Sequence, residues 1–144
     1  MFQTMEAARR RGEPTWSRGH LMGCNCVFTR ISVRSDGAYV PCVLLPQLVA
    51  GQIGQDRLEE VWRESPVLQA VRARADLSLA SFPECRGCPY TACCTGSCAG
   101  PSLSILGDVN RPNPEACLRR FLQELAAEGL SLRDEALPLD SYLL

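Results

Sequence analysis

The chain has 144 residues, and its 16 acidic and 15 basic side chains leave a formal net charge of −1. This length fits one small domain rather than two independent cores. The near-neutral charge excludes the basic surface by which proteins bind nucleic acid or an anionic membrane, so we expect no partner of either kind.

The pattern of apolar residues and cysteines indicates a cytoplasmic protein that binds metal. No run of about eighteen apolar residues could cross a membrane, and the first stretch, MFQTMEAARRRGEPTW, lacks the apolar core of a secretory signal. In the reducing cytoplasm, cysteines remain thiols unless a metal binds them. The nine cysteines therefore favour metal ligation over disulfides, which would also leave one cysteine unpaired.

Residues 1–22 are predicted to form a helical arm or linker. A short polar helix is expected within residues 1–20, followed by a stretch with glycine and proline that ends at His20, the only histidine. Imidazole is a common metal ligand. A single histidine in such an arm is nevertheless expected to be exposed rather than to bind metal.

A β-hairpin is predicted next, in VFTRISVRSDGAYVPC. Its apolar residues alternate with polar ones, which places the two sets on opposite faces of a strand; the apolar positions are Val27, Ile31 and Val33. Asp36 and Gly37 are expected to form the turn, because glycine tolerates the positive φ that hairpin turns require. The returning strand leads to Cys42.

A first helix is predicted after a loop over residues 44–55. Asp56 can cap its start, because aspartate accepts hydrogen bonds from the first N–H groups of a helix. The spacing of its apolar residues places them on one face; they are Leu58, Val61 and Trp62. Trp62 is expected to belong to the core.

Ser65 and Pro66 are expected to begin a second helix, because proline is favoured in the first helical turn. A second apolar stripe follows, and it consists of Leu68, Val71 and Ala75. Arg72 and Arg74 are expected to point away from this stripe.

The segment 77–112 has glycine, proline and cysteine in place of a regular apolar stripe, so it cannot easily bury a core of its own. We expect bound metal to order it, and the metal-free protein to be poorly ordered there. Asn113 and Pro114 then begin a last helix that ends at Gly129. Its buried stripe is expected to consist of Leu118, Phe121, Leu122 and Leu125.

Five of the nine cysteines lie in one stretch, CRGCPYTACCTGSC, at residues 85–98. Four of them have the spacing C-x2-C-x5-C-x3-C; they are Cys85, Cys88, Cys94 and Cys98. Loops this short let thiolates converge on one tetrahedral or cubane metal centre. Cys117 follows after a further eighteen residues, near the start of the last helix, where the helix dipole favours a thiolate.

The order of the cysteines resembles the SPASM domain, the cysteine-rich C-terminal extension of many radical SAM enzymes that modify peptides and proteins. The family pattern is CX9-15GX4C, a gap, CX2CX5CX3C, a gap and C, and Cys26-x10-Gly37-x4-Cys42 fits its first part. The resemblance runs from about Gly23 to Arg120. Its pieces are ISVRSDGAYVPC, GQIGQDRLEEVW, CRGCPYTACCTGSC and NPEAC.

This resemblance implies two auxiliary [4Fe-4S] clusters held by two sets of cysteines. The first cysteine set consists of Cys24, Cys26, Cys42 and Cys98, and the second cysteine set consists of Cys85, Cys88, Cys94 and Cys117. Cys24 and Cys26 both lie at an allowed distance from Gly37, so either both bind the first cluster or one is a spare beside an open iron site. Cys93 fits no ligand position and is expected to be a packed thiol.

The resemblance extends only to the C-terminal extension. The radical SAM core binds its catalytic cluster and S-adenosylmethionine through a CX3CX2C motif, and no such triplet occurs here. We therefore expect no catalytic residue and no S-adenosylmethionine site in this chain. The implied function is electron transfer or peptide-substrate binding for a radical SAM maturase, either in trans or as its truncated C-terminal part. The expected partners are a radical SAM core protein, a precursor peptide or both.

Two other functions fit parts of the pattern. A zinc-stabilised interaction module is the main alternative, because four cysteines with x2 spacing also suit Zn²⁺. A thiol oxidoreductase using Cys85 and Cys88 is less favoured, because the βαβ setting of such CxxC enzymes is absent.

These observations predict a small α+β domain, in which a β-hairpin and two or three helices surround two metal-cluster sites. The predicted divisions are an arm or linker (1–22), a SPASM-like iron–sulfur domain (23–122), and the end of the last helix with a tail (123–144).

Overall fold

The computed structural model describes residues 10–12, 19–22 and 25–130. The polar helix predicted within residues 1–20 falls largely outside this description, and Cys24 and the tail from residue 131 lie outside it. His20 is described, and it is half-buried rather than exposed. It pairs with Ser78 in an isolated antiparallel bridge, so part of the predicted arm belongs to the folded domain.

A three-stranded antiparallel sheet contains the predicted hairpin. The strands β1 (Ser32–Val33), β2 (Ala38–Val40) and β3 (Gly51–Gln52) lie in the order β1-β2-β3. In the register, Ser32 opposes Val40 and Tyr39 opposes Gly51. The predicted turn is confirmed: Gly37 has φ +84°, and the carboxylate of Asp36 accepts a hydrogen bond from the N–H of Ala38 at 3.2 Å.

The first strand is shorter than predicted. The alternating apolar residues of this segment also do not all lie on a buried face. The N–H of Val27 donates to the carbonyl of Arg30 at 3.0 Å, which closes a tight turn in place of extended backbone. Val27 is buried within this turn, whereas Val33 is 51% exposed. The third strand was predicted as loop, because a Gly-Gln pair carries none of the β-branched or aromatic signal of a strand.

The two helices predicted after the loop are present. The predicted start of the second helix is confirmed, whereas the predicted cap of the first helix is wrong. The helices are α2 (Leu58–Glu64) and α3 (Pro66–Arg72), and Pro66 occupies the first turn of α3. Asp56 does not cap α2, because its carboxylate accepts the N–H of Gln52 at 2.7 Å and ties the start of α2 to β3. Leu58 is 49% exposed, so the core-facing part of α2 is narrower than predicted.

The prediction that Arg74 points away from the apolar stripe is wrong. A 3-10 turn, η1 (Ala73–Asp76), follows α3 directly. Side chains three residues apart are eclipsed in a 3-10 helix, so Arg74 lies on the side of the buried Val71. Only 4% of Arg74 is exposed.

The segment that lacks an apolar stripe folds as a series of short turns around one unpredicted helix. The turns are η2 (Leu79–Ser81), η3 (Pro83–Cys85) and η4 (Thr91–Cys93), and the helix is α4 (Ala99–Leu106). The predicted last helix comprises a turn, η5 (Pro114–Ala116), and α5 (Leu118–Ala127). The Asn113 side chain accepts the N–H of Glu115 at 3.0 Å, which caps η5.

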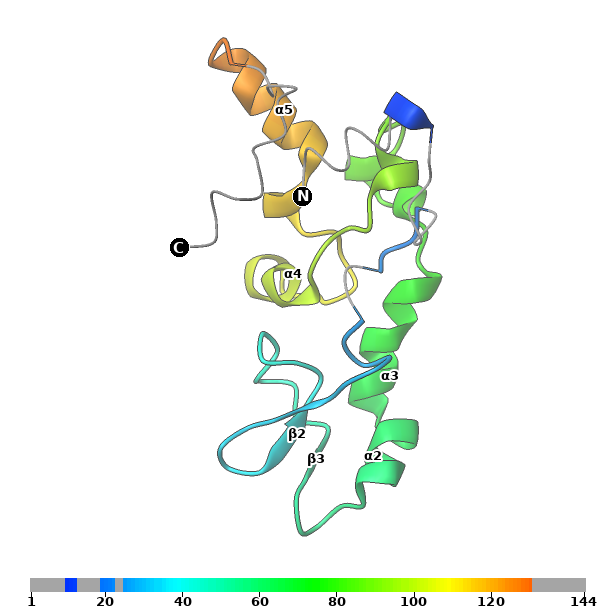
Figure 1. Cartoon of the computed structure of the whole chain (residues 1–144), viewed down its shortest axis with the longest axis vertical. Coiled ribbons are helices and arrows are strands. Elements are labelled where there is room, and N and C mark those ends of the chain that lie inside the picture. Colours follow the sequence, from blue (N-terminus) through cyan, green and yellow to red (C-terminus); the bar gives the residue numbers. More distant parts are fainter. Residues whose placement is uncertain (1–9, 13–18, 23–24, 131–144) are drawn as a thin grey trace.

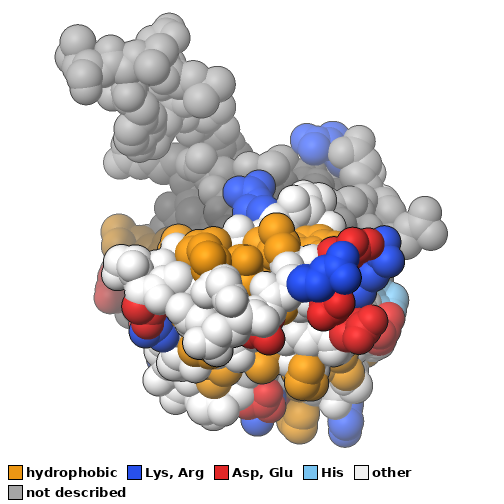
Figure 2. Space-filling model, turned by 90° about the horizontal axis from the view of Figure 1, so that it is seen from below, with side chains coloured by type: hydrophobic (Ala, Val, Ile, Leu, Met, Phe, Trp, Pro, Cys, Tyr) orange, Lys and Arg blue, Asp and Glu red, His pale blue; other side chains and the backbone are white. Residues whose placement is uncertain are grey.

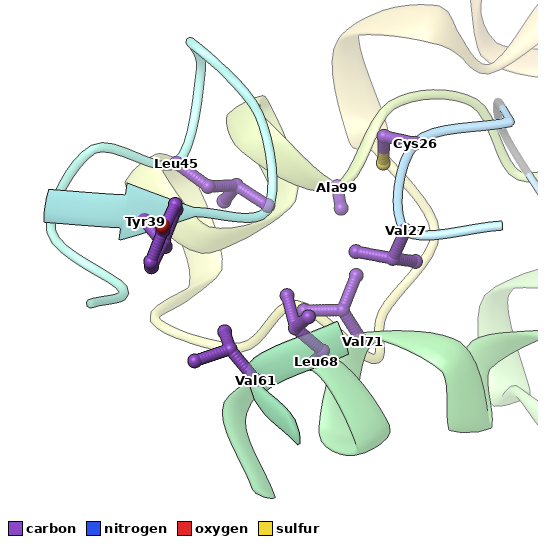
Figure 3. Packing of buried hydrophobic residues seen from close by; sticks show 8 residues of the cluster. All are labelled: Cys26, Val27, Tyr39, Leu45, Val61, Leu68, Val71 and Ala99. Atoms are coloured by element: carbon purple, nitrogen blue, oxygen red, sulfur yellow. The ribbon is translucent and has the colours of Figure 1, made fainter. Parts of the chain in front are cut away.

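The main apolar cluster lies between the sheet, the α2–α3 pair and the start of α4 (Figure 3). Its members are Cys26, Val27, Tyr39, Leu45, Val61, Leu68, Val71 and Ala99. Figure 1 shows α2 and α3 in a column beside β2 and β3, with α4 between the sheet and α5. The α5 end of the molecule is therefore held mainly by contacts outside this cluster.

Backbone hydrogen bonds of residues 19–22 join segments that are far apart in the sequence. The N–H of Leu21 donates to the carbonyl of Leu77 at 2.8 Å, and the N–H of Met22 donates to that of Thr95 at 2.9 Å. The short stretch preceding Cys26 thus runs beside the segment that carries most of the cysteines.

The surface at the sheet end carries apolar side chains among charged ones (Figure 2). The most exposed large apolar residues include Val43, Leu44 and Ile53, at 76%, 55% and 52%. Within the described residues, no helix has the length and apolarity needed to cross a membrane.

Gly96 occupies a position that only glycine fits well. Its φ is +67°, and a Cβ placed there would lie 2.1 Å from Cδ1 of Leu21 and 3.1 Å from Cδ2 of Leu79. A side chain would therefore push residues 19–22 away from the cysteine-rich segment.

We expect Gly96→Ala to lower the free energy of unfolding by about 2–5 kcal/mol, because it combines a left-handed backbone with an overpacked interior. Gly54→Ala is the matched control, since Gly54 has φ +81° but nothing within 4 Å of the added Cβ. Its cost should be about 1–2 kcal/mol. Urea unfolding without oxygen measures both values, and equal losses would contradict the packing argument.

Candidate metal centre

The four members of the second cysteine set line one cavity. Its volume is about 30 Å³, and Leu79 and Leu118 contribute apolar wall to it. The cysteines in its wall are Cys85, Cys88, Cys94 and Cys117. The structure thus brings together, from positions up to 32 residues apart in the sequence, the four thiols that the family resemblance implies as ligands of one cluster.

Short turns and helix ends position these thiols. Cys85 ends η3, and the N–H of Cys88 donates to its carbonyl at 3.1 Å. Cys94 follows η4 and Cys117 directly precedes α5, both with extended backbone. Extended residues at the ends of turns project their side chains away from the turn axis, and Cys117 also lies at the positive end of the α5 dipole.

Crowding and burial disfavour the charged forms of these thiols. Burial raises the pKa of Cys85 to about 11, with further contributions from the neighbouring Cys94, Glu84, Cys117 and Cys88. Burial also raises the pKa of Cys94, although the N–H of Gly96 donates to its sulfur at 3.3 Å and acts in the opposite direction. The raised pKa values of Cys85 and Cys94 favour their protonated forms until a cation compensates the negative charge.

An ion pair closes the outer side of the site. The guanidinium of Arg111 donates to the Glu84 carboxylate at 2.7 Å, and both side chains are 42% exposed. This hydrogen bond lowers the pKa of Glu84. Glu84 directly precedes Cys85, and Arg111 lies six residues before Cys117. The ion pair between Glu84 and Arg111 therefore links the first and the last cysteine of the second set.

A wider groove adjoins the same site. Its volume is about 470 Å³, and Cys85 and Cys117 line it as well as the smaller cavity. Its polar wall is predominantly basic, with Arg111, Arg119 and Arg120 against Glu84.

The described members of the first cysteine set adjoin the main apolar cluster. Cys26 is a buried member of it at 8% exposure, and Cys42 packs against it. Cys98 directly precedes Ala99, which is also a member, and Figure 3 shows Cys26 beside Ala99.

The start of α4 also packs on the loop that follows Cys42. A Cβ on Gly100 would lie 2.7 Å from Cβ of Leu44, and the N–H of Leu44 donates to the Cys42 sulfur at 3.3 Å. Cys42 and Cys98 are thereby placed on neighbouring segments. Cys26 lines a small cavity of about 10 Å³ together with Ala99, and Cys24 is not described.

The donor chemistry fits an iron–sulfur cluster. Among the described cysteines, no two are joined by a disulfide, so eight thiols are present. In the same part of the chain, no three His, Cys, Asp or Glu side chains lie close enough to hold a single metal ion. The four sulfurs of the second set therefore line the same cavity but are too far apart to bind one metal ion together. Thiolates are the ligands that iron–sulfur clusters require.

Cys93 is a packed thiol, as predicted. Its exposed fraction is 4%, and it is not among the residues that line the cavity of the second set.

Residues that support the cysteines were missed by sequence reasoning. The Thr91 hydroxyl donates to the carbonyl of Cys88 at 2.8 Å, and Arg72 and Arg74 donate to backbone carbonyls near Cys26 and Cys98. The motif pattern counts only cysteines and one glycine, so it carries no signal for these contacts.

Comparison with known proteins gives one match. A family model of the SPASM domain, described as an iron–sulfur cluster-binding domain, matches residues 24–89. This range includes five of the predicted ligands and ends before Cys94, Cys98 and Cys117. No curated protein and no solved structure matches the chain. The resemblance carried by the cysteine spacing is thus confirmed over residues 24–89, which match the SPASM family of iron–sulfur cluster-binding domains.

Proposed function

We propose that this chain binds two [4Fe-4S] clusters and serves a radical SAM protein, either in trans or as part of the same polypeptide. The observation that carries the proposal is the convergence of Cys85, Cys88, Cys94 and Cys117 on one cavity. The family match supports it, because SPASM domains bind iron–sulfur clusters.

The assigned roles follow the two cysteine sets. The second set holds one cluster inside the cavity, where Leu79 and Leu118 shield it from water. The first set holds the other, with Cys98 supplied by the segment between Cys94 and α4. Bound clusters would supply one-electron transfer.

A peptide substrate is proposed to lie in the groove beside the second set. Cys85 and Cys117 separate this groove from the inner cavity, so a bound peptide would lie next to the second cluster. Arg119 suits a carboxylate of such a peptide, because arginine binds carboxylates in a bidentate manner, whereas Arg111 and Arg120 already pair with Glu84 and Glu124. A radical SAM core protein is the proposed source of the chemistry on that peptide.

Iron and sulfide content tests the number of clusters. After reconstitution without oxygen, the full chain should hold about eight iron atoms, as two cubanes require. Cys88→Ser should lower this content to about half, because it removes a ligand of the second set only. The control is Cys93→Ser, which should leave the content unchanged. A colourless zinc protein, or full iron content in Cys88→Ser, would contradict the proposal.

Metal uptake by the cluster-free chain should be strongly pH-dependent. Thiols bind metal as thiolates, and the pKa of Cys85 is raised to about 11 with that of Cys94 also raised, so protons must leave before metal binds. Affinity should therefore increase from pH 7 to pH 9, by about tenfold per pH unit for each proton released. Iron and sulfide uptake at each pH, in competition with an iron chelator, measures this slope, and a flat profile would count against thiol ligation.

A further inference from the structure

We propose that Arg72 and Arg74 are positioning residues for the first cluster, an inference that rests on the proposed cluster-binding function. Each arginine binds the backbone carbonyl of a residue that adjoins a cysteine of the first set. Together they hold two strained backbone positions in place and bring two positive charges close to that cluster.

Two residues other than glycine have a positive φ among the described residues, and both adjoin a cysteine of the first set. Val27 follows Cys26 and Ser97 precedes Cys98, each with φ +61°. This conformation is strained for residues other than glycine, and a β-branched valine adopts it rarely. Strain of this kind persists only where surrounding contacts maintain it.

Arg72 supplies that contact at Val27. Its Nε donates to the carbonyl of Val27 at 2.8 Å, across 45 residues of sequence. Its guanidinium also lies over the ring of Trp62, 4.7 Å from the ring centre, which fixes its orientation. The peptide unit between Val27 and Phe28 is thereby held to α3, and Figure 3 shows Val27 beside Val71 of that helix.

Arg74 supplies the contact at Ser97. Its Nη2 donates to the carbonyl of Ser97 at 3.2 Å, and its Nη1 donates to the carbonyl of Arg111 at 3.3 Å. The carbonyl of Ser97 belongs to the peptide bond between Ser97 and Cys98. Arg74 and Cys26 also line one small cavity of about 10 Å³, together with Ala99.

The placement has an electrostatic consequence. Reduction of a cluster adds negative charge, which nearby cations stabilise, and this effect is strong where water is excluded. Arg74 is 4% exposed and Arg72 is half-buried. The two arginines should therefore raise the reduction potential of the first cluster relative to a neutral side chain of similar length.

The test compares Arg72→Met and Arg74→Met with Arg72→Lys and Arg74→Lys in the full chain, reconstituted without oxygen. Redox titration followed by electron paramagnetic resonance gives the midpoint potential of each cluster, and iron assay gives their number. The methionine variants should shift one of the two potentials to lower values, or lose that cluster and about half of the iron. The lysine variants keep the charge and should retain a potential close to that of the unchanged protein.

Arg63→Met is the matched control, because Arg63 is an exposed arginine of α2 that pairs with Glu59 at 3.0 Å. It should change neither the iron content nor either potential. If both methionine variants behave like this control, the positioning role is wrong while the proposed function stands. If the unchanged protein itself binds fewer than two clusters, the proposed function fails first. Equal loss of the cluster in lysine and methionine variants would show a purely structural role and would also overturn the inference.

Discussion

The convergence of four thiols on one cavity is the constraint on which the rest of this structure depends. The segment from Leu77 to Cys117 consists of short turns and the helix α4, and its contact with the main apolar cluster is made by Ala99, Leu103 and Val109. Its turns nevertheless bring Cys85, Cys88, Cys94 and Cys117 to one wall. Ligation of these sulfurs would contribute free energy directly to folding, as it does in small metal-binding domains.

The segments that carry the two cysteine sets are connected by hydrogen bonds of the backbone and of Arg74. Residues 19–22 pair with the carbonyls of Leu77 and Thr95 just before the chain enters the first cysteine set. Arg74 joins the carbonyls of Ser97 and Arg111 from a buried position. A displacement of either cysteine set can therefore be transmitted to the other through hydrogen-bonded backbone.

Sequence reasoning predicted the features that depend on local rules. The Asp36-Gly37 turn, the start of α3 at Pro66 and the end of α5 near Gly129 each follow from the backbone preference of one or two residues. The cysteine spacing explains part of the second set, because the short loops between Cys85, Cys88 and Cys94 limit how far their sulfurs can separate. The inclusion of Cys117 comes from the family resemblance.

The features that depend on tertiary contacts were not predictable in this way. Strand β3 exists because Gly51 pairs with Tyr39, and Asp56 binds the N–H of Gln52 instead of capping α2. Arg74 is buried where it donates to the carbonyls of Ser97 and Arg111, more than twenty residues further along the chain. These outcomes depend on partners far along the chain, which no local pattern identifies.

Hydrogen exchange of the full chain, with and without its clusters, tests most directly whether sulfur ligation orders the cysteine-rich segment. The amides of residues 77–112 should be weakly protected in the metal-free protein and become strongly protected when clusters are bound, because ligation supplies the order that apolar packing does not. Equally strong protection of this segment in both states would show that it folds without its sulfur ligands engaged, and would contradict the dependence of the fold on its clusters.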